Sequence, residues 1–485
     1  MISALQPLIR FRFRAAAAVG AALVAVGAAG CVDQQREVAV YRDVLAGHAP
    51  TTDQPAGESI DANTELSLTE AMARASRDNE RIALGGEKYL QALIDKDRTF
   101  ANFLPTISFS PAYFAREGVA NSFTPNHTLD APLTAQASLH TVSDIAQYRS
   151  AGMTAAQQRE LLLDLHATLL LEVAQTYYTV LQAEQSVDVL ANSLSVQDAR
   201  VTDVRDKLAQ GVARQLDLEQ SKAQAAATRA ALTGARRDVA RARATLAFLI
   251  GVPAVDGPLV DDYATPQEVA ELADLLDMAR AQRRDLLAAH EAVRAAHQAV
   301  EAAIGEYYPS LSINLQAFLY RESMPAESRF ASFIEANLPL FAAGRIRADV
   351  RDAWSRYRQS VQAESLLTRQ VAQQVEIARI DFTTAVQRIR DLQTEVSAAR
   401  EAFRIAGESY NSGLATNLDR LDAQDRLLSA DLRLTAATFE KTMAYLRLRR
   451  DVGRLDGPDA GHGDDALARR DPPPADALAA GASAD

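Results

Sequence analysis

Apolar residues recur at every seventh position along two long stretches of this chain of 485 residues. A strict repeat of seven does not fit a straight helix with about 3.6 residues per turn, so it predicts helices that supercoil left-handed around neighbours. An ordinary coiled-coil rod would show the same pattern, so the repeat alone does not decide the fold. The repeat positions are Val173, Val180, Val187, Leu194, Val201 and Leu208 in the first stretch, and Val375, Phe382, Ile389, Val396, Phe403 and Tyr410 in the second.

The second stretch repeats the first at a displacement of 202 positions. The same displacement relates Gly211 to Gly413, which follow the two long helical runs, and Asp217 to Asp419. An internal duplication is the simplest explanation. It predicts two structural repeats, residues 67–254 and 255–453, each with a helix, two strands, a long helix and a further helix.

The predicted helices have two lengths. Residues 146–209 and 345–411 would each span about 100 Å, whereas 68–103 and 216–250 would each span about 50–55 Å. Ser67 and Glu70 form a capping-box pattern at the start of the run 68–103, and Pro105 ends it. We expect two short helices, placed end to end, to match one long helix.

Four segments alternate apolar and polar residues with the period of a β-strand. They lie near 106–113, 129–139, 311–319 and 334–340. Each has about the 9–11 residues of a tilted transmembrane strand, although a half-buried hairpin of a soluble domain would look the same locally. Four strands cannot close a barrel, and lipid does not tolerate an open edge. The membrane interpretation therefore requires several copies of the chain, and strand faces polar enough to line water favour more than two.

The N-terminus has the pattern of a secretory signal peptide, residues 1–30, with arginines before an apolar run and small residues before Cys31. Cys31 is the only cysteine, and its setting predicts a lipidation site, with plain signal cleavage as the alternative. Residues 31–66 are predicted to form an extended, lipidated leader. Residues 454–485, rich in Pro, Ala, Gly and Asp, are predicted to be a disordered tail.

Composition and motifs disfavour several classes of protein. A net charge of -12 argues against binding to nucleic acid. The chain has no G-x-S-x-G, Walker loop or H-E-x-x-H motif and no second cysteine, so we expect neither an enzyme nor a metal site. His290 and His297 share a helix without a third ligand at suitable spacing. No cofactor is expected apart from a covalent lipid on Cys31.

Three motifs, taken with the duplicated plan, carry a resemblance that covers about residues 68–453. Tyr308-Pro-Ser-Leu311, Pro339-Leu-Phe-Ala-Ala-Gly-Arg345 and the segment after Gly413 resemble the TolC-like outer-membrane efflux factor family. The resemblance implies a mainly α fold with a membrane β-barrel. Long duplicated coiled-coil helices form an α-barrel tunnel, and four strands per protomer contribute to a trimeric barrel of twelve strands.

The same resemblance implies a function and partners. A homotrimer in the outer membrane, reaching into the periplasm, would be the passive exit duct of a tripartite efflux pump for small molecules. Its partners would be a periplasmic adaptor protein, an inner-membrane transporter of the RND, ABC or MFS type, and outer-membrane lipid. A conduit for type I protein secretion shares this fold and stays open as an alternative. A periplasmic coiled-coil adaptor or scaffold is the alternative from a different class.

The resemblance also assigns a periplasmic gate. Asp419 and Asp422 match two aspartates that ring the closed aperture, although carboxylates near a helix N-terminus are also favoured by the helix dipole. Tyr410 and Asp217 match a link between the inner helix pair and its neighbour. A second link of the family is missing here, because Ala415 stands in place of its arginine.

The two tips are the segments expected to contact the adaptor. The residues assigned to this docking by the resemblance are Gly211 and Val212 in the first tip, and Gly413 and Leu414 in the second.

Overall fold

The computed structural model describes residues 33–48, 57–115, 127–139, 141–261, 263–321, 328–455 and Leu467. None of the helices in this described part combines the length and the apolar character needed to span a bilayer. The predicted signal peptide, Cys31 and nearly all of the predicted tail lie outside the described residues, so these assignments stay predictions.

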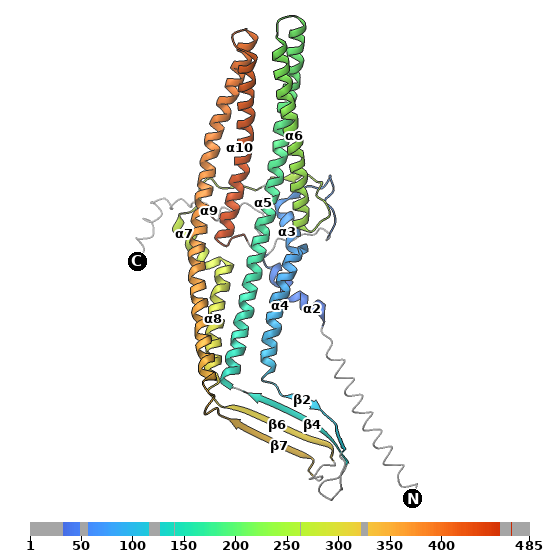
Figure 1. The fold of residues 1–485 in the computed structure, drawn as a ribbon, viewed down its shortest axis with the longest axis vertical. Helices are drawn as coiled ribbons and strands as arrows, with labels where there is room; N and C mark the ends of the chain where they lie inside the picture. Colours follow the sequence, from blue (N-terminus) through green and yellow to red (C-terminus); the bar gives the residue numbers. More distant parts are fainter. Residues whose placement is uncertain are drawn as a thin grey trace, which may run out of the picture.

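Two antiparallel helical hairpins form one end of the elongated molecule (Figure 1). In the first, α5 (Thr141–Ala209) turns into α6 (Gln215–Ile250), and in the second, α9 (Arg345–Asn411) turns into α10 (Asn417–Asp451). The predicted long and returning helices are thereby confirmed. Several positions of the seven-residue repeat are fully buried, namely Val173, Val180, Val375 and Phe382.

Two short helices meet end to end at Asn79, next to the C-terminal end of α6. The predicted single helix over 68–103 is wrong here, because α3 (Leu68–Asp78) ends and α4 (Glu80–Ala101) begins at this residue, whose backbone is extended. The Asn79 side chain accepts a hydrogen bond from the Arg81 N–H at 2.9 Å and donates one to the Leu249 carbonyl at 2.9 Å. One amide thus caps the start of α4 and the end of α6, where backbone groups lack helical partners.

The second half repeats this junction with a different side chain. There α7 (Leu272–Gln282) and α8 (Arg284–Gly305) meet at Arg283. The Arg283 guanidinium is buried, donates to the Asp451 carbonyl at the end of α10 at 3.4 Å, and pairs with Asp285 at 2.9 Å. Both halves therefore join their short helices through one buried polar side chain.

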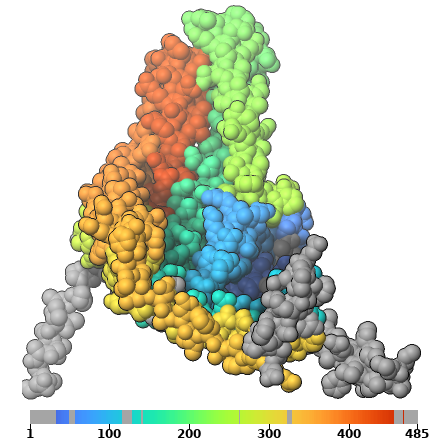
Figure 2. Space-filling model, turned by 60° about the horizontal axis from the view of Figure 1, so that its bottom comes forward, coloured from blue at the N-terminus to red at the C-terminus, as the bar shows by residue number. Residues whose placement is uncertain are grey.

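A five-stranded antiparallel sheet forms the opposite end of the molecule from the hairpin tips (Figure 1). Figure 2, with this end brought forward, shows the yellow strand region crossing below the helices. Its order is β2-β4-β6-β7, and β3 also pairs with β4. The first predicted strand is divided in two near Pro111, and the last ends at Asn337 rather than 340. The strands are β2 (Thr106–Phe109), β3 (Ala112–Ala115), β4 (His127–Leu139), β6 (Ser310–Arg321) and β7 (Phe330–Asn337).

The hydrophobic core is concentrated midway between the sheet and the tips. Here β1 (Leu66–Ser67) pairs in parallel with β5 (Leu259–Val260). The fully buried Tyr177 hydroxyl accepts from the Val260 N–H at 2.9 Å and lies 2.7 Å from the carbonyls of Leu66 and Val260. A single phenol therefore ties α5 to both strands and joins the two repeats.

Part of the predicted extended leader is helical, which corrects that expectation. α2 (Gln34–Ala46) begins after Asp33, whose carboxylate accepts from the amides of the first turn. Its buried Tyr41 packs on α4 at Gly86, where an added Cβ would come within 2.4 Å of the Tyr41 ring. The mostly polar helix is held by a few apolar side chains and by a glycine that lets it approach α4.

Three described residues of the predicted disordered tail also have fixed places. Arg454 donates from Nε to Gln282 Oε1 at 3.1 Å, and Leu455 is fully buried in the core. Leu467 is buried in the mid-level core, and its carbonyl accepts a hydrogen bond from the Ala270 N–H at 2.9 Å. The prediction for 454–485 is therefore wrong at these three residues.

The buried His166 generates a prediction about stability and pH. Its Nε2 lies 2.8 Å from the Ser76 Oγ, which itself donates to the Met72 carbonyl, so the neutral ring donates from Nε2. Burial, and secondarily the nearby His48, lowers the pKa of His166 from 6.5 to about 4. The unfolded chain therefore binds the proton more readily, and stability is lost as the pH falls from 6.5 towards 4.

We expect this loss to reach about 3 kcal/mol at the low end of that interval. Thermal unfolding of the detergent-solubilised protein at pH 7 and pH 4.5 measures it. His166→Gln keeps an amide that can bond Ser76 but does not titrate, so its unfolding temperature should fall less between the two pH values. An equal fall in both proteins would contradict the assignment.

Candidate channel gate at the helical tips

The two helical tips have the same backbone geometry. Gly211 and Gly413 adopt φ values of 75° and 76°, in the left-handed region where a side chain would be strained. In each tip the N–H of the next residue donates to a carbonyl five positions back, at 2.9 Å in the first and 2.8 Å in the second. These bonds close each long helix with a Schellman motif, which explains why glycine stands at both positions.

In its first turn, each returning helix then carries one of the predicted gate aspartates, which accepts hydrogen bonds from the residue three positions before it, and in α10 the two residues form a full capping box. Asp419 Oδ2 accepts from the Thr416 N–H at 2.8 Å and from the Thr416 hydroxyl at 2.7 Å. Asp217 Oδ2 accepts from the Arg214 N–H at 3.1 Å, and its Oδ1 from the Arg214 guanidinium at 2.8 Å. The hydrogen bonds from Thr416 hold the pKa of Asp419 below the usual value for aspartate. The hydrogen bond from the Arg214 side chain holds the pKa of Asp217 below that value as well. Both residues therefore have a structural role in starting a helix.

The predicted gate residues do not share one environment. Asp419 and Asp422 are exposed on the first two turns of α10, and Asp422 pairs with Arg426 at 2.8 Å. Asp217, by contrast, is only 6% exposed. Two carboxylates are thus available to a passage at the tip, and the third faces the interior.

Tyr410 contacts cations through its ring. Its centroid lies 4.1 Å from the Arg420 guanidinium carbon and 5.1 Å from Lys207 Nζ. Among the described residues, Tyr410 and Asp217 share no hydrogen bond, so the link expected between them is not formed within this one chain. Arg420, from the first turn of α10, packs against the ring instead.

Asn417 connects the two hairpins directly. Its side chain, 2% exposed, donates to the Asp217 carbonyl at 3.2 Å and lies 3.3 Å from the Ser221 hydroxyl. Sequence reasoning missed both Asn417 and Arg420. The signal was present, because they share one helical face with Leu421 and Gln424 at helical spacing. All four side chains on this face are buried against the first hairpin.

Large apolar side chains at both tips are exposed. Val212 is 72% exposed and Leu414 is 85% exposed, and Leu216 and Leu418 one turn further are also exposed. At Gly211 and Gly413 an added Cβ would meet nothing within 4 Å. The predicted docking residues therefore form two small, protruding apolar surfaces.

Among the described residues, no group of three or more His, Cys, Asp or Glu is placed so that it could hold a metal ion. His290 pairs with Glu364 at 3.2 Å, and the His297 ring packs on Tyr357 with centroids 5.6 Å apart. Both histidines thus have contacts of their own.

The chain is similar to curated relatives in sequence and to solved structures in fold. The multidrug resistance outer membrane protein MdtP of Escherichia coli is 26% identical over 290 residues, 58% of this chain and 59% of MdtP. The probable efflux pump outer membrane protein TtgC of Pseudomonas putida is 29% identical over 304 residues, 59% of this chain and 60% of TtgC. These matches span about three fifths of the relatives' lengths. The outer membrane protein VceC of Vibrio cholerae superposes with a TM-score of 0.70 at 20% identity, over 80% of this chain and 96% of VceC.

The family model described as outer membrane efflux protein matches residues 91–252 and 275–454, which include both hairpins, the junction at Arg283 and the five-stranded sheet. With the duplicated helices, the strand pairs and the glycine-closed tips in place, this chain belongs to the outer membrane efflux protein family.

Proposed function

We propose that this chain forms the outer-membrane channel of a tripartite efflux pump, a passive exit duct for small molecules expelled by an inner-membrane transporter. The proposal rests on the difference between the two ends of the molecule. One end is a sheet with exposed apolar side chains, and the other end consists of the protruding apolar tips (Figure 1). The duct crosses the outer membrane at the sheet and extends into the periplasm. The names of the relatives, a probable efflux pump outer membrane protein and a multidrug resistance outer membrane protein, support this choice over protein secretion.

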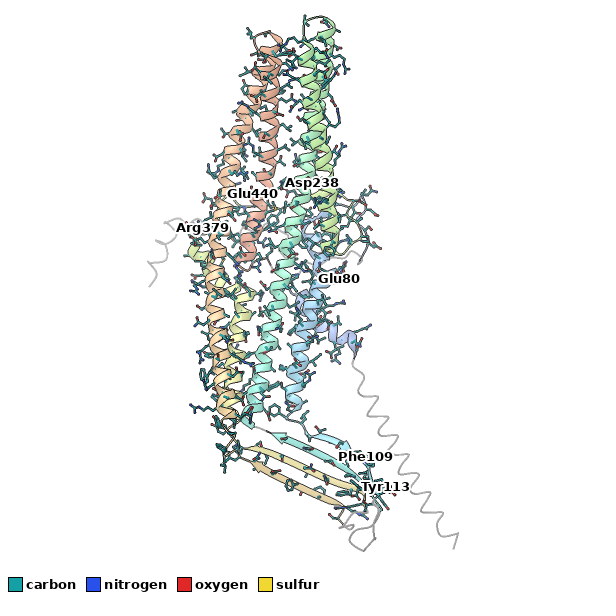
Figure 3. All side chains as sticks on the ribbon, viewed as in Figure 1. Glu80, Phe109, Tyr113, Asp238, Arg379 and Glu440 are labelled. Atoms are coloured by element: carbon teal, nitrogen blue, oxygen red, sulfur yellow. The ribbon has the colours of Figure 1, made fainter. Side chains whose placement is uncertain are left out.

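The sheet supports the membrane end of the proposal. Figure 3 shows Phe109 and Tyr113 on the strands at this end. Tyr113 is 64% exposed, Phe330 60% and Ile334 68%, which is unfavourable in water and favourable in lipid. Among the described strands, β7 is hydrogen-bonded on one side only. Lipid does not tolerate such an edge, so neighbouring copies must complete it, and three copies give the twelve-stranded barrel.

An exposed seam on α9 supports the homotrimer. Nine exposed positions, spaced alternately four and three residues apart, carry no charge. This is a second heptad seam beside the buried one, and an uncharged seam of this kind is where another helix packs. The positions are Gln359, Ala363, Leu366, Gln370, Gln373, Ile377, Ile380, Thr384 and Gln387.

The opposite lateral edge of the chain presents a matching seam on α6. Figure 3 places Arg379 of α9 and Asp238 of α6 on different sides of the helical wall. The α6 seam combines small residues with two arginines and ends at Phe248, which is 73% exposed. Its positions are Gln220, Ala223, Ala227, Ala230, Gly234, Arg237, Arg241, Ala244 and Phe248.

Charge complementarity favours packing of these two edges between copies. The end of α9 and the start of α6 both lie at the tips. Asp391, which continues the α9 seam, lies 20 residues before the end of α9, and Arg237 lies 22 residues after the start of α6. The two therefore stand at nearly the same distance from the tips and carry opposite charges. A head-to-tail contact of this type closes a ring.

The tips are the proposed docking surface for a periplasmic adaptor, which links the duct to a transporter of the RND, ABC or MFS type. Gly211, Val212, Gly413 and Leu414 form the most protruding apolar surface at this end. The gate lies directly behind them, with Asp419 and Asp422 of three copies around one axis. Tyr410 and Asp217 act on it indirectly, through Arg420 and Asn417 of α10.

The first prediction concerns assembly. Ile377→Asp combined with Ile380→Asp places two buried charges in the proposed seam, so the trimer should dissociate. Light scattering corrected for bound detergent should give three chains for the unaltered protein and one for the variant. Thr383→Asp with Gln393→Asp adds the same charge at exposed positions outside the seam and should stay trimeric. A stable monomer without any substitution would contradict the assembly.

The second prediction concerns the gate. Asp419→Asn with Asp422→Asn removes six carboxylates from the axis, while the Asn oxygen can still accept from Thr416. Single channels in planar bilayers should lose cation selectivity and block by multivalent cations. Asp425→Asn, an exposed carboxylate on the next turn of α10, should retain both properties. Unchanged selectivity in the double variant would remove these residues from the gate.

The third prediction concerns the lipid anchor. The first described residue, Asp33, begins α2, so an acyl group on Cys31 would lie within a few residues of a docked helix. Mass spectrometry of the mature N-terminus should find Cys31 as the first residue, carrying acyl chains. The Cys31→Ala protein should lose them. Cleavage elsewhere, or an unmodified thiol, would reject the anchor while leaving the channel proposal in place.

A further inference from the structure

Buried polar side chains line the contact between α5 and α10 just behind the tips. Arg420 is 4% exposed, Gln424 5% and Gln197 2%, and Arg200 faces the same contact from α5. Within the described part of the chain, four of their buried polar atoms have no hydrogen-bond partner: Arg200 Nη1, Arg420 Nε, Gln197 Oε1 and Gln424 Oε1. Buried groups of this kind normally have partners, so the cluster points to a missing ligand.

The cluster carries an excess of positive charge. Arg200, Arg420 and Lys207 bring three cations, and the facing carboxylate is that of Asp203. Asp203 lies 3.1 Å from Lys207 Nζ but 4.0 Å from Arg420 Nη1. Arg214 and Asp217 at the tip neutralise each other, and Asp431 beyond Gln424 pairs with Arg400 at 3.9 Å. The facing groups therefore leave about two positive charges uncompensated at the contact.

Aromatic rings offset only part of this charge. The Arg420 guanidinium carbon lies 4.1 Å from the Tyr410 ring centroid, and that of Arg200 lies 5.7 Å from the Phe403 centroid. Burial, and then repulsion by Arg420, lowers the pKa of Arg200 to about 10, so the Arg200 guanidinium keeps its charge at neutral pH. Two like charges held behind the tips push the two hairpins apart.

A bound anion would give the unpaired polar groups a hydrogen-bond partner and would also neutralise excess positive charge. Water can satisfy an N–H but cannot neutralise the guanidinium pair, whereas an anion does both. The two glutamines can also turn their amides to donate to it. A cavity of 260 Å³ bordered by Phe403 and Gln424 adjoins the cluster and provides a way in. Because the side chains are packed between two helices in contact, a monatomic ion fits better than a polyatomic one.

We propose that Arg200 and Arg420 bind one small monovalent anion, with chloride as the model ion, between α5 and α10, and that this ion holds the two hairpin tips together. Binding itself does not depend on conduction. Failure of this site would therefore leave the proposed channel intact, and failure of the channel would leave the site intact.

Hydrogen exchange measured by mass spectrometry tests the site in the full-length, detergent-solubilised protein. Sodium chloride is compared with sodium gluconate at equal sodium concentration. Peptides covering 197–207 and 417–427 should exchange about tenfold more slowly in chloride, with a saturable dependence on its concentration. Peptides of the sheet and the mid-level core should not respond. Equal exchange in the two salts would overturn the proposal in favour of a neutral water bridge.

Substitutions identify the ligands. Arg420→Gln should abolish the response to chloride, and Arg433→Gln, an exposed arginine of the same helix paired with Glu395, should keep it. Arg200→Met removes one of the two repelling charges with a side chain of similar length. In gluconate, the tip peptides of this variant should be as protected against hydrogen exchange as those of the unaltered protein are in chloride. A response to chloride that survives in both Arg420→Gln and Arg200→Met would place the ion elsewhere and overturn the assignment.

Bromide replaces chloride in crystals and scatters anomalously. One peak between the Arg200 and Arg420 guanidinium groups is the expected result. A map with no peak there, in crystals grown in bromide, would contradict the proposal independently of any variant.

Discussion

The end-to-end junctions of the short helices set the dimensions on which the rest of the structure depends. A long helix such as α9 needs a partner along its whole length, and the chain supplies two shorter helices joined at one buried side chain. Asn79 bonds the Leu249 carbonyl, and Arg283 bonds the Asp451 carbonyl. Because each junction satisfies helix ends that would otherwise lie buried without partners, the wall can continue past it. The sheet and the tips are thereby held at opposite ends of the molecule.

The tips show how one residue can meet a structural and a functional demand. Asp419 begins α10 by accepting two hydrogen bonds from Thr416, and the same carboxylate is exposed where the proposed passage narrows. Its equivalent, Asp217, caps α6 in the same way but is buried. The duplication thus preserved the capping role in both halves, while the exposure of the carboxylate differs. A gate assigned from these residues has to be tested with substitutions that keep the cap.

Features that depend on periodicity and on backbone conformation could be predicted from the sequence. The heptad positions around Val173 and Val375 predicted the long helices, and the paired glycines predicted tips that the structure confirms at φ values of 75° and 76°. The break at Asn79 was missed because no proline or glycine marks it, and only the approach of α6 gives the extended residue its partner. The helix α2 was missed because two buried residues, Tyr41 and Leu45, hold an otherwise polar segment. Arg420 and Asn417 share a helical face with Leu421 and Gln424, but they were missed because polar residues on such a face become buried only when the two hairpins come into contact.

We propose that several copies of this chain close into one duct, with α9 of one copy against α6 of the next. An electron cryo-microscopy map of the full-length protein in lipid nanodiscs tests it most directly. The map should show three copies around one axis, Ile377 and Ile380 buried at the boundary between copies, and a continuous passage from the tips through the sheet. A particle with a single copy, or with the Ile377 seam facing solvent around a filled axis, would contradict it.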